Sequence, residues 1–246
     1  MNWQWFYRLG SPRWFYEKTA IWETWLAGIS ITLLSIGIIW GLGFAPADSY
    51  QGNSARIMYI HVPNAILAMA GYYVMAISGA IALVWRMKLS FMVMRSAAYI
   101  GAVMTFTALI TGALWGKPTW GTYWEWDARM TSTLILFLLY LGVIALQHAY
   151  SNQDTADKTS AILALVGSVN IPIIYLSVKY WNTLHQGASI KIVGESSIHA
   201  SMAYPLIVMI FAYYFTFAWL LLSHTRTEIL HREKKTVWVQ DLIKES

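Results

Sequence analysis

The sequence predicts an all-α integral membrane protein with six transmembrane helices. Hydrophobic residues make up 57% of the 246-residue chain and charged residues only 12%, whereas soluble domains are about 25% charged. The mean hydropathy of +0.47 is too high for a single globular core. In addition, six stretches without Asp, Glu, Lys or Arg are long enough to cross a membrane.

These six stretches give the expected elements in order. Each is rich in aliphatic and aromatic residues and lacks the two-residue alternation of a membrane strand, so each is expected to be a helix. We expect a single membrane domain over residues 1–246. Its spans are predicted at residues 22–43, 58–85, 96–115, 131–149, 160–178 and 202–223, with a tryptophan-rich loop at 115–132.

The two ends of the chain are expected to lie outside the spans. Residues 1–19 mix aromatic and basic side chains, which is typical of a segment that lies on the inner leaflet. The first span is too long for the apolar part of a signal peptide, so we expect it to be retained. The tail from Arg226 is charged and is expected to be a solvated extension.

The distribution of basic residues predicts the orientation. Six spans put both termini on one side, and twelve of the 17 Lys and Arg residues fall in segments on that side. The positive-inside rule therefore places the termini in the cytoplasm and residues 43–57, 115–130 and 179–199 outside. This bias accounts for the net charge of +5 without a nucleic-acid partner.

The chain has no cysteine. This excludes disulfides, thiolate metal ligands and any thiol–disulfide step carried out by the chain itself.

Four tryptophans lie within the second outer segment, at Trp115, Trp120, Trp124 and Trp126. Because Gly and Pro interrupt this segment, we expect no continuous helix before Tyr123. An aromatic belt at the membrane surface explains one or two such rings per span. A dense cluster instead forms a flat apolar surface that can stack on a planar π-system.

Charged residues lie beside this cluster. Asp127 and Arg129 are both able to order the loop through hydrogen bonds. Arg129 and Arg56 lie on the same predicted side and could face a carboxylate of a ligand, because guanidinium is a planar donor.

Three of the six histidines, His61, His185 and His199, lie on the outer side. His61 opens the second span beside Pro63, a residue suited to a first helical turn. His185 follows the fifth span. A single histidine near a helix end is commonly a hydrogen-bonded interfacial residue, but two at one depth beside the tryptophans indicate metal ligands. His199 lacks this context and is expected to be structural.

Heme matches these features together. It is a flat apolar macrocycle with two carboxylates and an iron that takes two axial ligands. The tryptophans, the two histidines and the outer arginines each suit one part of it. Zinc is the competing metal, but a closed zinc site needs further ligands that are not evident in the sequence.

Residues 120–132, WGTYWEWDARMTS, resemble the WWD signature of heme-handling proteins. With the runs at 43–48, 59–63, 115–118 and 181–187, they make the chain similar to the CcmC family, the heme exporters of cytochrome c maturation. The resemblance extends over nearly all six spans. Tyr123 stands where the family commonly has Trp, which changes the size and polarity of that ring.

The resemblance implies roles for individual residues. His61 and His185 match the axial histidines of the family, and the WWD platform matches Trp115, Trp120, Trp124, Trp126 and Asp127. It also implies a multi-pass protein of the bacterial inner membrane that binds b-type heme non-covalently and transiently at the periplasmic face. The implied partners are the heme chaperone CcmE, the ABC-type ATPase CcmA, its membrane subunit CcmB and the single-span protein CcmD, within membrane lipid.

Two other functions stay open at this point. A cytochrome b-type redox subunit would pair histidines inside the membrane, whereas His61 and His185 share one outer edge. A small-solute permease would carry ionisable or broken-helix sites near mid-membrane, where the spans hold no Asp, Glu, Lys or Arg and Pro172 is the clearest interruption. Heme holding and transfer needs no catalytic residue, so the chain is not expected to be an enzyme.

Overall fold

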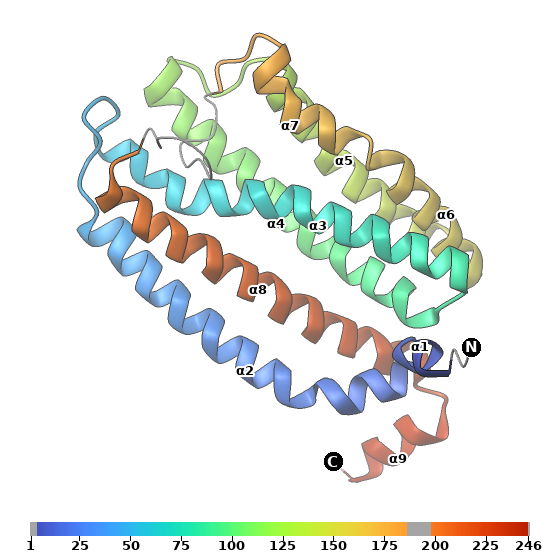
Figure 1. Cartoon of the computed structure of the whole chain (residues 1–246). Helices are drawn as coiled ribbons and strands as arrows, with labels where there is room; N and C mark the ends of the chain where they lie inside the picture. The colour runs from blue at the N-terminus through green and yellow to red at the C-terminus, as the bar shows by residue number, and fades with distance from the viewer. Residues whose placement is uncertain (1–3, 186–197, 246) are drawn as a thin grey trace.

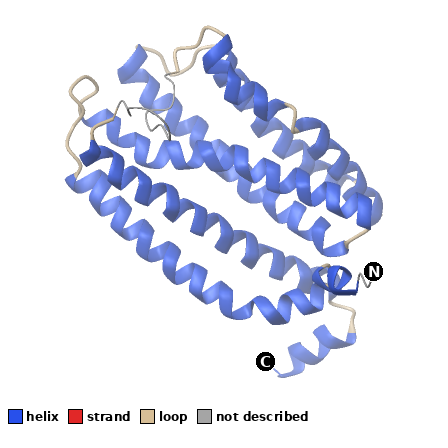
Figure 2. Ribbon diagram, viewed as in Figure 1, coloured by secondary structure: helices blue, strands red, loops and turns tan. Residues whose placement is uncertain are grey.

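Helices make up nearly all of the computed structural model, which describes residues 4–185 and 198–245 (Figure 2). Within these residues six segments are long and apolar enough to cross a membrane, and no strand is present. The long helices are α2 (Pro12–Ile38), extended by a π-helical segment (Ile39–Phe44), α3 (Met58–Trp85), α4 (Lys88–Trp120), α5 (Ala128–Ala149), α6 (Gln153–Gly167), α7 (Asn170–Tyr180) and α8 (Ala200–Glu233). Two short helices, α1 (Gln4–Leu9) and α9 (Val237–Glu245), flank them.

The bundle has two distinct ends (Figure 1). Both termini lie at one end, together with the α3–α4 and α5–α6 connections; we call it the termini end. The opposite end carries residues 45–57, 121–127 and 181–185; we call it the tryptophan-rich end. Residues 186–197, which include Lys191 and part of the third expected outer segment, lie outside the described residues.

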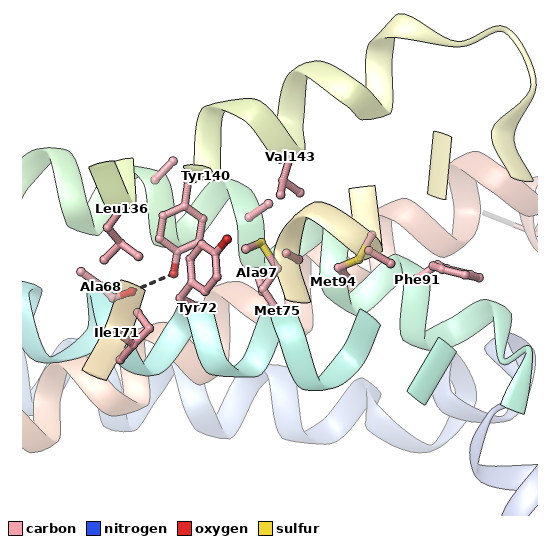
Figure 3. Packing of buried hydrophobic residues seen from close by; sticks show 14 of the residues in the cluster. Ala68, Tyr72, Met75, Phe91, Met94, Ala97, Leu136, Tyr140, Val143 and Ile171 are labelled. Atoms are coloured by element: carbon pink, nitrogen blue, oxygen red, sulfur yellow. Dashed lines mark hydrogen bonds between the residues drawn. The ribbon is translucent and has the colours of Figure 1, made fainter. Parts of the chain in front are cut away.

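The core is built on two tyrosines (Figure 3). The rings of Tyr72 and Tyr140 lie 4.9 Å apart in an edge-to-face arrangement. The Tyr140 hydroxyl donates to the carbonyl of Ala68 at 2.8 Å. Gly101 on α4 makes room for this ring, because a Cβ there would lie 2.2 Å from Cζ of Tyr140. Small residues allow such close helix contacts in membranes, and here they hold α3, α4 and α5 together.

The tryptophan-rich loop is shorter than the expected 115–132. Helix α4 runs through Pro118 to Trp120, so the expectation of no continuous helix before Tyr123 is wrong. A proline removes only one helical hydrogen bond, and this helix ends two residues later. Gly121 terminates it in the left-handed conformation (φ 80°), which glycine adopts without a steric penalty. Residues 121–127 form the remaining loop.

The fifth span is two helices rather than one. Helix α6 ends at Gly167 and α7 begins at Asn170. The ring of Pro172 would clash with the carbonyl four residues earlier, at Ser168, which explains a break at this point. The amide of Asn170 donates to the carbonyl of Ser132 at 2.9 Å and joins α7 to α5.

The chain ends are more helical than the sequence suggests. Helix α2 begins at Pro12, capped by Ser11, so the second half of the 1–19 segment continues directly into the first span. The expectation of a solvated tail from Arg226 is wrong for its first part, residues 226–233. Helix α8 extends to Glu233, and Arg226 pairs with Glu23 at 2.8 Å. Ion pairs across helices satisfy the charges that made this tail look soluble.

Candidate heme site at the tryptophan-rich end

His61 lies in the first turn of α3 and is buried against α4. Its Nδ1 lies 3.0 Å from the carbonyl oxygen of Ala108 and 3.1 Å from Oγ1 of Thr111. Because a carbonyl can only accept, Nδ1 carries the hydrogen and the lone pair is on Nε2. A histidine held in this way through Nδ1 has the tautomer and ring orientation of a metal ligand.

Gly112 sets the distance between His61 and α4. A Cβ at this position would lie 3.0 Å from Cε1 of the His61 ring. Any larger residue would therefore press on the ring and displace it.

His185 follows α7 and its ring approaches that of His61. The two ring centres are 6.3 Å apart, and the ring planes are inclined by 36°. Metal–imidazole bonds of about 2 Å, with the distance from each nitrogen to its ring centre added, place two axial imidazoles about 6 Å apart. The spacing therefore fits one iron between the two rings.

An indole lies beside each histidine. The ring of Trp115 meets His61 edge-on at 5.7 Å, and that of Trp120 lies 6.3 Å from His185. The indole N–H of Trp115 donates to Oε1 of Gln51 at 2.8 Å. This bond joins residues 45–57, which we call the first loop, to the tryptophans beside the histidines.

The other two tryptophans form a pair of their own. The rings of Trp124 and Trp126 meet edge-to-face at 5.4 Å. Trp126 is 72% exposed, whereas the indole N–H of Trp124 is buried without a hydrogen-bond partner. The expected four-tryptophan platform thus divides into two rings beside the histidines and two rings on the loop, near the exposed Tyr123.

Asp127 joins two elements of the site. One carboxylate oxygen accepts from the backbone N–H of Met130 at 2.7 Å and caps α5. The other accepts from Oγ1 of Thr183 at 2.5 Å and from the N–H of Leu184 at 3.1 Å. Sequence reasoning missed Thr183, since only its place two residues before His185 could have indicated it.

The two arginines have different surroundings. Arg56 donates through Nη1 to the carbonyl of Leu42 at 2.9 Å and through Nη2 to that of Ala45 at 2.8 Å. These bonds hold the first loop, and only Nε of Arg56 is buried without a partner. Arg129 makes one long contact, 3.5 Å from Nη1 to the carbonyl of Ile174. Of the two arginines, Arg129 therefore has the weaker hydrogen bonding to the protein and the more available N–H donors.

His199 serves as a helix cap. Its Nδ1 accepts from the N–H of Ser201 at 3.3 Å at the start of α8. Within the described part of the chain, no group of three or more His, Asp or Glu side chains is placed to hold a metal ion. Two protein ligands suit heme iron, because the porphyrin supplies the other four.

Comparison with known proteins identifies the family. A family model described as heme exporter protein C, CcmC, matches residues 5–240. The chain belongs to the CcmC family. It is 47% identical to the heme exporter protein C of Haemophilus influenzae over 240 residues, which cover 98% of each chain.

Other CcmC proteins are equally similar. The Escherichia coli K12 protein is 48% identical over 241 residues, 98% of this chain and 97% of its own. The Bradyrhizobium diazoefficiens protein is 48% identical over 229 residues, 93% of this chain and 87% of its own. Both are heme exporter protein C, and the residues matched by the family model include all six long apolar segments.

Proposed function

We propose that this chain binds heme between His61 and His185 and transfers it to an acceptor during cytochrome c maturation. The observation that carries the proposal is the paired geometry of the histidines. Their ring centres are 6.3 Å apart, and the Nδ1 hydrogen bond of His61 leaves its Nε2 available. Membership of the heme exporter protein C family supports the same ligand.

The remaining site residues orient the cargo. Trp115 and Trp120 flank the histidines with flat apolar rings suited to a macrocycle. Arg129 is the donor we assign to a propionate. Arg56 acts at a distance by holding the first loop, and Trp124 and Trp126 extend the apolar surface toward the acceptor.

The transfer chemistry belongs largely to the heme and the acceptor. The chain has no cysteine and offers no thiol nucleophile. It holds a b-type heme non-covalently and transiently, with a histidine on each face of the ring, and leaves an edge of the ring exposed to the acceptor. In this account the chain is a carrier component and not an enzyme.

The proposal also includes an orientation and partners. The excess of Lys and Arg on the side of the termini supports cytoplasmic termini and a periplasmic heme site in the bacterial inner membrane. The acceptor is the heme chaperone CcmE, and CcmA, CcmB and CcmD complete the membrane assembly.

An absorption spectrum tests the ligands. The full-length protein is purified in detergent with CcmE present to trap heme, as wild type, His61→Ala, His185→Ala and the double variant. We expect a bis-imidazole spectrum that weakens in each single variant and is absent in the double variant. A full bis-imidazole spectrum in the double variant would sink the assignment.

Cysteine labelling tests the orientation. Because the chain is free of cysteine, Tyr50→Cys places a single thiol at a residue that is 97% exposed on the tryptophan-rich end. We expect a membrane-impermeant maleimide to label it in intact spheroplasts. Labelling only after lysis would show that the tryptophan-rich end faces the cytoplasm, opposite to the proposed orientation.

A further inference from the structure

A hydrogen-bonded chain connects Asp127 to the backbone of His185. Asp127 accepts from the hydroxyl of Thr183 at 2.5 Å, and the same hydroxyl oxygen accepts from the N–H of His185 at 3.1 Å. The N–H of Leu184 donates to the same carboxylate oxygen as Thr183, at 3.1 Å. Thr183 and Leu184 are thus bonded to one carboxylate, and His185 is linked to it through the Thr183 hydroxyl.

From this series of hydrogen bonds we infer that Asp127 and Thr183 are positioning residues that place His185 opposite His61. The inference rests on the proposed function and deepens it. In this inference the aspartate of the WWD signature, Asp127, acts by holding the segment that carries His185. It does not act by contacting the heme macrocycle itself.

The local structure explains why His185 needs these hydrogen bonds from Asp127 and Thr183. His61 belongs to a helix and is held by its own Nδ1 bond to Ala108. His185 lies five residues beyond the end of α7 at Tyr180, where no helical hydrogen bonds define its backbone. A ligand outside regular structure needs side-chain bonds to reach the accuracy that metal ligation requires.

The two oxygens of Asp127 allow its two roles to be separated. Oδ1 caps α5 through Met130, and Oδ2 holds Thr183 and Leu184. In Asp127→Asn the amide oxygen can still cap the helix, but the amide nitrogen cannot accept from Leu184. The cap of α5 is then retained, while the bonds of residue 127 to Thr183 and Leu184 are weakened.

Thr183 gives the sharper test. Thr183→Val keeps the shape of the side chain and removes the hydroxyl from both of its bonds. Thr183→Ser keeps the hydroxyl and is the conservative control. Thr133→Val is a matched control on α5, because it loses a hydroxyl that donates only to the carbonyl of Arg129, at 2.8 Å.

Heme affinity is measured by titration of the purified full-length protein. Loss of a residue that orients a metal ligand lowers affinity about 10- to 100-fold, so we expect a loss of at least about tenfold for Thr183→Val and a smaller loss for Asp127→Asn. Thr183→Ser and Thr133→Val should stay close to wild type. Wild-type affinity in Thr183→Val would overturn the inference.

A double-variant cycle shows whether Thr183 acts through His185. In a His185→Ala background, Thr183→Val should cause no further loss, because the residue it positions is gone. An equal loss in both backgrounds would refute the positioning role. If His185→Ala itself binds heme like wild type, the proposed function has failed; if only Thr183→Val does, the inference alone has failed.

A heme-free measurement completes the test. Spin labels at Tyr50→Cys and Trp181→Cys, which are 97% and 54% exposed, report the position of the His185 segment relative to the first loop. We expect Thr183→Val to broaden the distance distribution and Thr183→Ser to leave it narrow. Reduced heme affinity with an unchanged distribution would mean that Thr183 does not act by placing the segment.

Discussion

At each end of the bundle two of the three histidines form a close pair or share a partner, but the two arrangements differ. At the tryptophan-rich end, His61 and His185 approach each other with ring centres 6.3 Å apart. At the termini end, Tyr99 contacts both His148 and His224. Its hydroxyl lies 2.6 Å from Nε2 of His148, and its ring stacks on His224 at 5.3 Å.

The difference lies in what the rings of each pair contact. His61 is bonded through Nδ1 to a backbone carbonyl, which leaves Nε2 available. His148 has its Nε2 engaged by the tyrosine, and Nδ1 of His224 lies 3.1 Å from Oγ of Ser96. Two histidines near one end of the bundle therefore do not by themselves indicate a pair of metal ligands; the 6.3 Å spacing of the rings distinguishes His61 and His185.

The two ends also differ in how they are held. Hydrogen bonds order the described residues of the tryptophan-rich end: the carboxylates of Asp48 and Asp127 accept from backbone N–H groups, and the guanidinium of Arg56 donates to backbone carbonyls. The termini end has a buried ion cluster, in which Arg232 contacts Asp157 at 2.6 Å and Glu228 at 2.5 Å. Arg95 of α4 lies 3.5 Å from the same glutamate. These charges join α4, α6 and α8, so we expect the termini end to contribute more to stability and less to heme binding.

The largest expected effect separates the two histidine pairs. His61→Ala should lower heme affinity at least about 100-fold, more than the loss of a residue that only orients a ligand. His224→Ala and His148→Ala should leave the affinity within about twofold of wild type, since both rings contact Tyr99 at the opposite end of the bundle from His61. Heme titration of the three variants measures this, and an equal loss in His224→Ala would place a second heme ligand at the termini end.

The next effect tests the ion cluster. Asp157→Ala leaves Arg232 with one carboxylate partner fewer in a buried site, which costs about 3–5 kcal/mol of unfolding free energy. Asp154→Ala on the same helix is the control, because its pair with Lys158 is exposed and contributes less than about 1 kcal/mol. SDS-induced unfolding of the detergent-solubilised protein measures both. Equal stability of the two variants would remove the contrast between the ends.

A smaller effect is expected at Gly112. Gly112→Ala places a Cβ 3.0 Å from the His61 ring, and overpacking of this kind costs about 1–3 kcal/mol. Because the ring must shift, the cost should appear as weaker heme binding. Gly28→Ala, with no atom within 4 Å of the added Cβ, should bind heme like wild type. Unchanged affinity in Gly112→Ala would show that His61 tolerates displacement.

The smallest effect concerns the first loop. Gln51→Leu removes the acceptor of the Trp115 indole N–H, a bond worth about 0.5–1.5 kcal/mol. We expect heme affinity to fall by roughly threefold and Gln51→Glu, which keeps an acceptor, to retain it. An identical loss in both variants would show that the loop contributes shape and not this bond.

The sequence predicted the membrane helices well because lipid imposes a simple rule. Long stretches without charge predict spans, and the six segments are present in the structure. Charged residues beyond those stretches misled the prediction at the termini end. Arg226 and Arg232 belong to the last long helix, because partners from distant helices neutralise them. Such pairing is a tertiary property that no local pattern reveals.

Part of the arrangement of side chains at the tryptophan-rich end was predicted from the sequence. His61 and His185 could be paired because both lie at the same expected depth, and the structure brings their rings together. Thr183 and Gln51 could not be found, since each depends on a contact with a residue more than fifty positions away. The end of α4 at Trp120 was also missed, because a proline near a helix end is tolerated.

The first and last spans form the side-by-side pair seen in Figure 1, where α2 lies along α8. Ser30 and Thr216 share a hydrogen bond of 2.7 Å across this pair, and most residues of the first span are not buried within the bundle. During synthesis, α2 therefore enters the bilayer long before its main partner exists. Because most of its surface faces lipid, α2 can be stable in the bilayer as an independent helix until α8 is made. The bundle is then completed only when the last span has left the ribosome.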